Sequence, residues 1–222
     1  MIDETEQRET IVRLAASLFA RGYAVGSAGN ISVRLDEGYL ITPTNASLGS
    51  LQPDRISRLD RDFKHVGGER PSKEVFMHRA FYRARPETGA VVHLHSTMAT
   101  AVACLADVDP LAPIPPLTPY FIMRIGRHLP IVGYYRPGDP AMESAIHQAA
   151  QIGKAALLAN HGPVVSGATL VDAVNASEEL EESARLYLLL SSRAIRPLTS
   201  EQIDDLLLHS PEMATVPRSG RP

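Results

Sequence analysis

The spacing of apolar residues predicts a helix near each end of the chain. Apolar positions in residues 4–21 recur on one helical face, at Ile11, Leu14, Ala15 and Leu18. Gly22 follows this stretch as a stop signal. Thr169 and Asp172 have the spacing of a capping box, so we expect the last long helix to run from Thr169 to about Leu190.

Between these two helices, signals for strands and helices alternate. The segments GSAGNISVRL and YLITPTN, joined by an acidic turn that ends at Gly38, predict a β-hairpin. The apolar run that begins at Ala90 and the stretch Ala155–Ala159 predict buried strands. Further helices are expected at residues 72–85, 96–105 and 139–151. The five prolines of residues 107–119 predict an extended loop.

A hairpin combined with strand–helix alternation predicts an α/β fold, in which helices cover both sides of a mixed sheet. No internal repeat or linker divides the chain. We therefore expect residues 1–210 to form one domain, followed by a disordered tail over residues 211–222.

The composition is that of an ordinary globular protein, with 222 residues, 44% hydrophobic and 21% charged. No apolar run approaches the roughly 20 residues of a membrane span, and the acidic N-terminus is not typical of a secretory signal. The single cysteine, Cys104, excludes an internal disulfide framework and favours the cytoplasm. A net charge of −3 gives no reason to expect a nucleic acid partner.

The segment AVVHLHST carries the most informative chemistry of the chain. His93 and His95 lie two residues apart in an apolar run, and residues i and i+2 of a strand share one face. Glu74 lies upstream, and a third histidine, His161, lies downstream in ANHGP. Three imidazoles with one carboxylate are the composition of a catalytic zinc site rather than of a closed structural site.

The other histidines need no metal to explain them. We interpret them as surface or hydrogen-bonded core residues: His65, His78, His128, His147 and His209. His78 follows Glu74 by four residues, and a simple contact on one helical face suffices to explain it. Two histidines on an apolar strand differ, because burying polar rings costs free energy unless something binds them.

With these residues in view, the chain resembles the class II aldolase/adducin family from the first helix to about residue 208. The resemblance is carried by five motifs in the family order: AGNISVR, LITPTNASL, PSKEVFMHRAFYRARP, AVVHLHST and ANHGPVVSG. It implies a three-layer α/β/α fold with a central mixed, largely antiparallel sheet. It also implies a cyclic homotetramer with zinc at subunit interfaces. By position, His93, His95 and His161 match the zinc ligands, and Glu74 matches an acid/base that can also touch the metal.

The resemblance further implies a phosphate pocket, formed by Asn30, Thr44, Asn45, Ser72 and Lys73. Hydroxyl and amide donors near a helix N-terminus suit an anion, although turn and cap roles alone would explain several of them. Two residues depart from the aldolases of the family, which commonly have glycine in place of Asn45 and serine in place of Lys73. Lys73 adds a positive charge that could pair with a second anionic group on a substrate.

The motifs TPTNASL, PSKEVF and GYYRPGDP look most like the subgroup that decarboxylates 3-oxo-tetronate 4-phosphates to dihydroxyacetone phosphate and CO2. The resemblance thus implies a carbon–carbon lyase that uses Zn2+, with Mn2+ or Co2+ as possible substitutes. The alternatives are a fuculose-phosphate-like aldolase and a non-catalytic, adducin-like binding protein. A 4-epimerase is disfavoured because such relatives usually carry aspartate in place of Glu74. Tyr120 matches a tyrosine near the substrate, a role that surface packing would explain equally well.

Some features stay open at this point. The substrate could belong to the erythronate or the threonate series, because no residue spacing reveals the shape of a pocket. Arg136 has no assigned role, and Asp139 is expected to cap a helix.

Overall fold

The structure is a computed structural model, and residues 3–209 are described. Its centre is an eight-stranded sheet in the order β4-β3-β2-β1-β5-β8-β7-β6. Only the short pair β6–β7 is parallel among these strands, so the predicted mixed, largely antiparallel sheet is confirmed. The strands are β1 (Asn30–Leu35), β2 (Gly38–Ile41), β3 (Ser57–Leu59), β4 (His65–Gly67), β5 (Ala90–His93), β6 (Ile131–Val132), β7 (Ala155–Leu158) and β8 (Gly162–Gly167).

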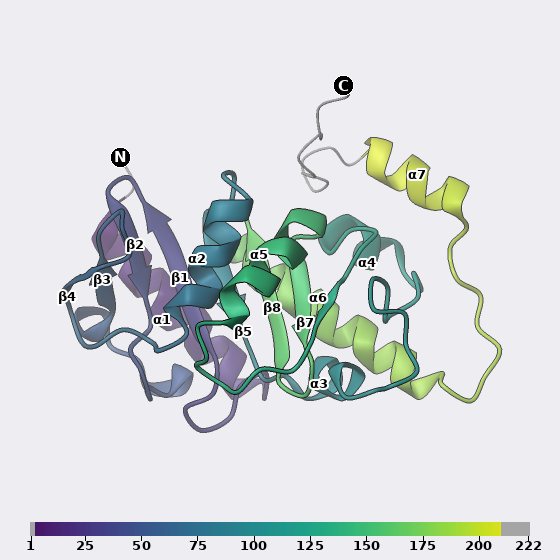
Figure 1. The fold of residues 1–222 in the computed structure, drawn as a ribbon, viewed down its shortest axis with the longest axis horizontal. Coiled ribbons are helices and arrows are strands. Elements are labelled where there is room, and N and C mark those ends of the chain that lie inside the picture. The colour runs from purple at the N-terminus through teal and green to yellow at the C-terminus, as the bar shows by residue number, and fades with distance from the viewer. Residues whose placement is uncertain (1–2, 210–222) are drawn as a thin grey trace.

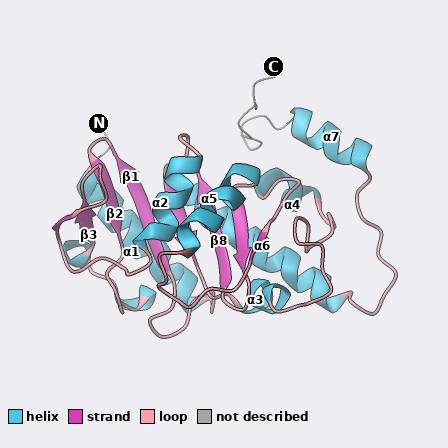
Figure 2. Ribbon diagram, viewed as in Figure 1, coloured by secondary structure: helices cyan, strands magenta, loops and turns pink. Residues whose placement is uncertain are grey.

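Helices cover both faces of the sheet, as the three-layer prediction requires (Figures 1 and 2). One face carries α2 (Val75–Ala84) and α5 (Met142–Ile152), which pack against each other, and α5 also packs against β6 and β7. The other face carries α1 (Glu4–Ala20), α3 (Thr97–Ala103), α4 (Pro119–Arg124) and α6 (Leu170–Leu189), and α7 (Ser200–His209) packs against α4 away from the sheet (Figure 1). Short 3-10 turns, η1 (Leu48–Ser50) and η2 (Pro53–Arg55), pack against α1.

Alternation along the central strands separates the two cores. Val91 and Val164 point to the α2–α5 side, whereas Val92 packs with the α1 side and Val165 with the α6 side. His93 is two residues beyond Val91, and antiparallel pairing places it opposite Asn30 of β1. The side chains of His93 and Asn30 therefore face α2, because residues i and i+2 of a strand share a face.

Most of the predicted elements are present, and their ends follow from local hydrogen bonds. The capping box of α6 forms as predicted between Thr169 and Asp172. In the hairpin, Gly38 has a φ of 103°, a conformation that favours glycine after the acidic turn. At the start of α1, the Asp3 carboxylate accepts hydrogen bonds from the amides of Thr5 and Glu6.

Two boundary predictions around the candidate site are wrong. The helix predicted from Ser72 begins at Val75, because the Val75 amide donates to the Ser72 carbonyl in a turn. The histidine strand ends at His93, so His95 lies beyond it rather than on it. The alternating pattern also missed β8, which is buried along almost its whole length and so shows no alternation. It missed α4 and the short strands β3, β4 and β6 as well, since a few residues carry too little periodicity.

None of the helices described in residues 3–209 has both the length and the apolar character needed to cross a bilayer. The tail predicted for residues 211–222 lies outside the described residues, and the single domain of residues 1–210 stays a prediction.

Candidate metal centre

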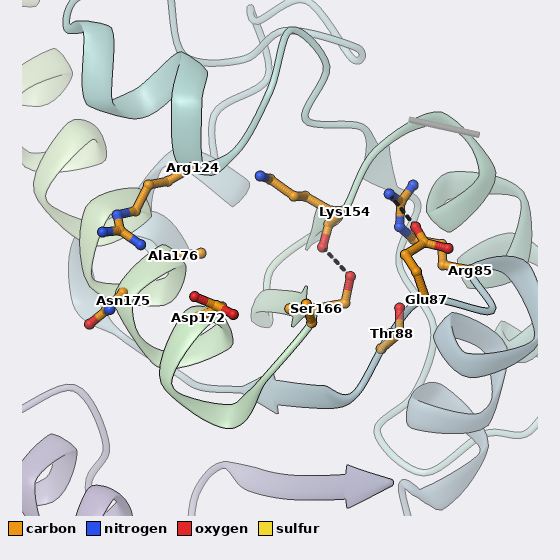
Figure 3. A pocket seen from close by; sticks show the side chains of 11 residues that line it. Arg85, Glu87, Thr88, Arg124, Lys154, Ser166, Asp172, Asn175 and Ala176 are labelled. Carbon is orange, nitrogen blue, oxygen red and sulfur yellow. Dashed lines mark hydrogen bonds and ion pairs between the residues drawn. The ribbon is translucent and has the colours of Figure 1, made fainter. Parts of the chain in front are cut away.

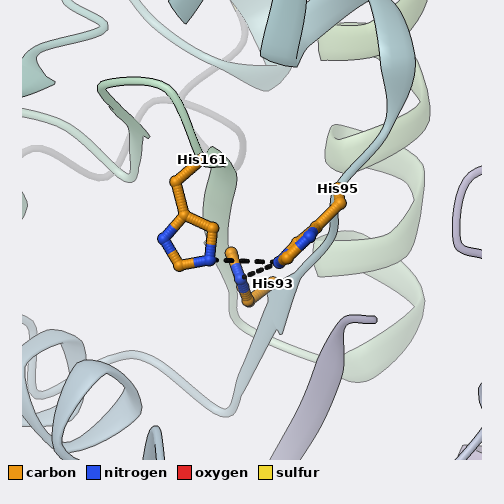
Figure 4. Close-up of side chains that lie close together, drawn as sticks. All are labelled: His93, His95 and His161. Atoms are coloured by element: carbon orange, nitrogen blue, oxygen red, sulfur yellow. Dashed lines mark hydrogen bonds between the residues drawn. The ribbon is translucent and has the colours of Figure 1, made fainter. Parts of the chain in front are cut away.

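Three histidine rings converge at the ends of neighbouring strands (Figure 4). His93 ends β5, His95 follows two residues later, and His161 lies in the tight turn between β7 and β8. The Nε2 atom of His95 is 3.1 Å from Nε2 of His93 and 3.1 Å from Nε2 of His161. The rings stand nearly edge to face, with centroids 4.7–4.9 Å apart.

The turn that carries His161 explains why its sequence reads Asn-His-Gly. Asn160 has a φ of 57°, in the left-handed region that asparagine tolerates better than most residues. Two residues after Asn160, a Cβ on Gly162 would lie 2.3 Å from the carbonyl oxygen of Leu94. Only glycine therefore lets the start of β8 approach the end of β5, which brings His161 beside His95.

Hydrogen bonding and burial keep these histidines in the form that binds metals. The Nδ1–H of His93 donates to the carbonyl oxygen of Pro163 at 2.9 Å, so its Nε2 carries a lone pair. Burial lowers the pKa of His93 well below its usual range, and it also lowers the pKa values of His95 and His161. Metal ions bind neutral imidazole, so these shifts favour metal binding at neutral pH.

The donor set fits a divalent ion. Zn–N bonds of 2.0–2.1 Å at tetrahedral angles separate two ligand nitrogens by roughly 3.3 Å, close to the 3.1 Å observed here. The carboxylate of Glu74 lies on one side of this group, with Oε2 3.8 Å from His93 Nε2 and Oε1 3.8 Å from His161 Nε2. Among the residues described, these three histidines form a group able to hold a metal ion.

A cleft of about 350 Å³ opens onto the histidines and Glu74. All five residues predicted to bind phosphate line it, together with Glu74, His95 and His161: Asn30, Thr44, Asn45, Ser72 and Lys73. His93 is fully buried behind them. The structure therefore gathers residues spread over 132 positions of the chain, from Asn30 to His161, into one site. Residues that sequence reasoning did not single out also line the cleft, among them Val25 and Ser27, together with Pro137 of the motif GYYRPGDP.

The two residues that depart from the aldolases each have a structural explanation. Asn45 has a φ of 57°, so asparagine keeps a backbone conformation that glycine also adopts and adds an amide at the cleft. The alkyl chain of Lys73 lies against Gly138, where a Cβ would come within 3.3 Å of its Cδ. Gly138 therefore packs beside Lys73, and the neighbouring Pro137 lines the same cleft.

Three other residues named from the sequence fall outside the group. Tyr120 is 61% exposed on α4 and does not line the cleft of its own chain. Asp139 accepts a hydrogen bond from the amide of Ala141 in the turn before α5, but Ala141 is the N-cap of that helix and no side chain caps it, so the predicted capping role of Asp139 is wrong. Arg136 is exposed.

His78 is connected to the candidate site by hydrogen bonds, a connection that was not predicted from the sequence. It is a hydrogen-bonded core histidine, as predicted, but its hydrogen bonds go to Asn30 and Ser32 rather than to Glu74. Asn30 in turn donates to Glu74 Oε2 at 2.8 Å. The sequence signal that could have revealed this connection is the spacing of Glu74, His78 and Tyr82, which are four residues apart along one helical face.

A second cavity, of about 380 Å³, lies beside the start of α6 and contains none of the predicted site residues (Figure 3). Arg85, Arg124 and Lys154 give it three cationic groups, and Glu87 and Asp172 contribute carboxylates. Burial, together with the guanidinium groups of Arg85 and Arg124, lowers the pKa of Lys154 to about 8.

Comparisons with known proteins agree with this geometry. The profile of the family described as "Class II Aldolase and Adducin N-terminal domain" matches residues 9–188. The 3-oxo-tetronate 4-phosphate decarboxylase of Haemophilus influenzae is 49% identical over 201 residues, which cover 90% of this chain and 95% of that protein.

Solved structures match closely as well. The crystal structure of YgbL from Escherichia coli superposes with a TM-score of 0.89 at 48% identity and covers 91% of this chain and 98% of that one. An L-fuculose 1-phosphate aldolase superposes with a TM-score of 0.81 at 27% identity and covers 91% of this chain and 94% of that one.

Proposed function

The chain belongs to the class II aldolase and adducin family, and from this premise we propose that it decarboxylates a 3-oxo-tetronate 4-phosphate to dihydroxyacetone phosphate and CO2. Decarboxylases of this kind from several bacteria are 45–49% identical to the chain over 86–91% of its length. The protein is accordingly a carbon–carbon lyase of the carboxy-lyase type.

The observation that carries the proposal is the position of Lys73. It lines the cleft next to Glu74, within a site whose remaining donors suit a phosphate group. A substrate that bears both a phosphate and a carboxylate gives this lysine an anionic partner, whereas a sugar phosphate cleaved by an aldolase has no carboxylate. Lys73 thus serves recognition of the group that leaves as CO2.

The chemistry follows from the substrate's 3-oxo acid. Breaking the C1–C2 bond releases CO2 and leaves its electron pair as an enediolate across C2 and C3, which takes up one proton at C2 to give dihydroxyacetone phosphate. A divalent ion held by the three histidines would supply a Lewis acid that polarises the C3 carbonyl.

Glu74 supplies the proton. Because its Oε2 accepts a hydrogen bond from Asn30, Oε1 is the oxygen left to carry a proton toward C2. The backbone amides and hydroxyls around Thr44 and Ser72 hold the phosphate and so fix the position of C2 beside this oxygen.

Aldol cleavage is the second candidate, and the structural likeness to L-fuculose 1-phosphate aldolase favours it. Both reactions pass through an enediolate next to a carbonyl, so the three histidines and Glu74 would serve either. The reactions differ in the leaving group, which is CO2 in one and an aldehyde in the other. An adducin-like binding role without metal does not account for three converging imidazoles.

Zinc is the proposed ion, with manganese or cobalt as substitutes, since three imidazoles and a carboxylate suit all three. A cyclic homotetramer with its sites at subunit interfaces is proposed from the family. Tyr120 is exposed and outside the cleft of its own chain, so it can act in catalysis only by reaching the site of a neighbouring copy. A phosphorylated substrate and a single cysteine fit a reaction in the cytoplasm.

The test is a product assay on metal-loaded protein with the erythronate and threonate forms of 3-oxo-tetronate 4-phosphate, following CO2 and dihydroxyacetone phosphate together. Fuculose 1-phosphate, assayed on the same preparation, is the matched aldol substrate. We expect stoichiometric CO2 and dihydroxyacetone phosphate from one of the two acids and no aldehyde from the sugar phosphate. Aldehyde release without CO2 would replace the decarboxylase with the aldolase.

A further inference from the structure

We infer that His78 is a positioning residue, which fixes the orientation of the Glu74 carboxylate through the side-chain amide of Asn30. The inference rests on the proposed function in one respect, the use of Glu74 as acid and base. His78 itself lies behind the cleft and does not line it.

The residues involved interlock between α2 and β1. Glu74, immediately before α2, and His78 and Tyr82 within it are spaced four apart, so all three face the sheet. Asn30 and Ser32 are two residues apart on β1 and point back toward that helix. Ser32 Oγ lies 2.7 Å from His78 Nδ1 and 2.8 Å from the Tyr82 hydroxyl. His78 Nε2 lies 2.5 Å from Asn30 Oδ1.

One assignment of donors and acceptors satisfies the whole chain of contacts. Because the Asn30 amide nitrogen donates to Glu74 Oε2, its oxygen faces His78, and His78 must donate from Nε2. The Nδ1 atom of His78 then accepts from the Ser32 hydroxyl, whose oxygen accepts from Tyr82. The opposite tautomer of His78 would turn the Asn30 amide around and set its oxygen against a Glu74 carboxylate oxygen, two acceptors in contact.

Burial makes this arrangement hard to replace. Asn30, Ser32 and His78 are at most 4% exposed, so little water can take over a lost hydrogen bond. Burial also lowers the pKa of His78 to about 3, which keeps the ring neutral and able to accept at Nδ1. A buried polar network with every member satisfied specifies one geometry.

This network fixes the orientation of the Glu74 carboxylate. Among the described residues, Asn30 is the side chain that donates a hydrogen bond to this carboxylate. With Oε2 held by Asn30, Oε1 faces His161 at 3.8 Å. His78 therefore determines which carboxylate oxygen faces the reacting carbon without touching the substrate.

Kinetics of three variants test this role. We expect His78→Phe to lower kcat about 10–100-fold, the usual scale for partners one step behind a site, with KM changed less than about threefold. His78→Gln keeps a donor within reach of Asn30 and should recover kcat at least about tenfold relative to His78→Phe. His147→Phe is the matched control: His147 contacts the Ala80 carbonyl from α5 in the same layer, and kcat should stay unchanged.

Equal kcat losses in His78→Phe and His78→Gln, or a similar loss in His147→Phe, would overturn the inference, because a purely structural role predicts them. Nitrogen-15 NMR of the metal-free wild-type protein gives a readout that needs no activity. We expect the His78 proton on Nε2, and an Asn30 amide signal that shifts in both Glu74→Gln and His78→Phe. A proton on Nδ1 of His78 would overturn the inference, whether or not the protein releases CO2. A protein that releases no CO2 but carries the His78 proton on Nε2 would contradict only the proposed reaction.

Discussion

Two cavities of this protein, the histidine cleft and the cavity beside α6, are similar in size but arranged in opposite ways. In the cleft at the ends of β5 and β7, neutral imidazole nitrogens converge within 3.1 Å, and the Glu74 carboxylate stands beside them. In the cavity beside α6, two of the three cationic groups have partners in the fold: Arg85 pairs with Glu87 at 2.8 Å, and Lys154 donates to the Met123 carbonyl at 3.2 Å.

The difference shows that neither cavity volume nor a shifted pKa identifies a reactive site. Burial lowers the pKa of Lys154 in one cavity and of His95 in the other. The distinguishing feature is the convergence of three imidazole nitrogens on one point, because such a set gains most from binding a cation. The following predictions test that distinction.

The largest effect is expected from His95→Ala. Removing the imidazole that lies 3.1 Å from both other rings should abolish stoichiometric metal binding and product formation together, while the fold is retained. Metal content by mass spectrometry and circular dichroism check these expectations. Full metal occupancy in the variant would contradict the assignment of the site.

Glu74→Gln should lower turnover roughly 10²–10⁴-fold, the usual contribution of general acid–base catalysis. The amide retains an oxygen that can accept from Asn30 but cannot exchange the proton, so part of the metal affinity should remain. Steady-state CO2 release, normalised to bound metal, measures the effect. Turnover near that of the wild type would remove Glu74 from the acid/base role.

Lys73→Ser should lower kcat/KM for the carboxylated substrate by about tenfold, equivalent to about 1.4 kcal/mol, and should affect a sugar phosphate much less. The serine matches the residue of the aldolases, and the exposed lysine contributes a solvent-screened charge. The measurement is kcat/KM of the variant and the wild type on the carboxylated substrate and on the sugar phosphate in parallel. Equal losses would assign Lys73 to the phosphate or to neither group.

The wild-type protein should lose more stability in acid than His78→Gln. The pKa of His78 is about 3 in the folded protein, against 6.5 for an unperturbed histidine. Below pH 6.5 the unfolded chain therefore binds a proton that the folded chain excludes, and stability falls as pH is lowered. Between pH 7 and pH 5 the wild type should lose about 1–2 kcal/mol more than the variant. Urea unfolding at both pH values measures this, and equal losses would show that His78 is not buried in its neutral form.

The smallest effect is expected from Lys154→Met. This substitution removes a cation from the second cavity while leaving the histidine cleft untouched, so kcat and metal content should stay within about twofold of the wild type. A loss of CO2 release comparable to that of Lys73→Ser would show that the two cavities are coupled.

Much of the local structure follows from signals between residues that are close together in the chain. Periodicity and capping signals specified α1, the β1–β2 hairpin and α6, because local hydrogen bonds such as those of Thr169 with Asp172 depend on neighbouring residues. The family motifs identified the three histidines, Glu74 and the cleft residues as candidates. The shorter strands and α4 carried too few residues for a periodic signal.

The way in which these candidate residues come together depends on contacts between distant parts of the chain. Antiparallel pairing of β1 with β5 sets Asn30 opposite His93, and the close approach at Gly162 brings His161 beside His95. The same pairing turns Asn30 and Ser32 toward α2, where they meet His78, a histidine that looked ordinary in the sequence. Tyr120, by contrast, is left on the surface. Contacts between residues far apart in the chain depend on strand register and helix packing, which no local spacing encodes.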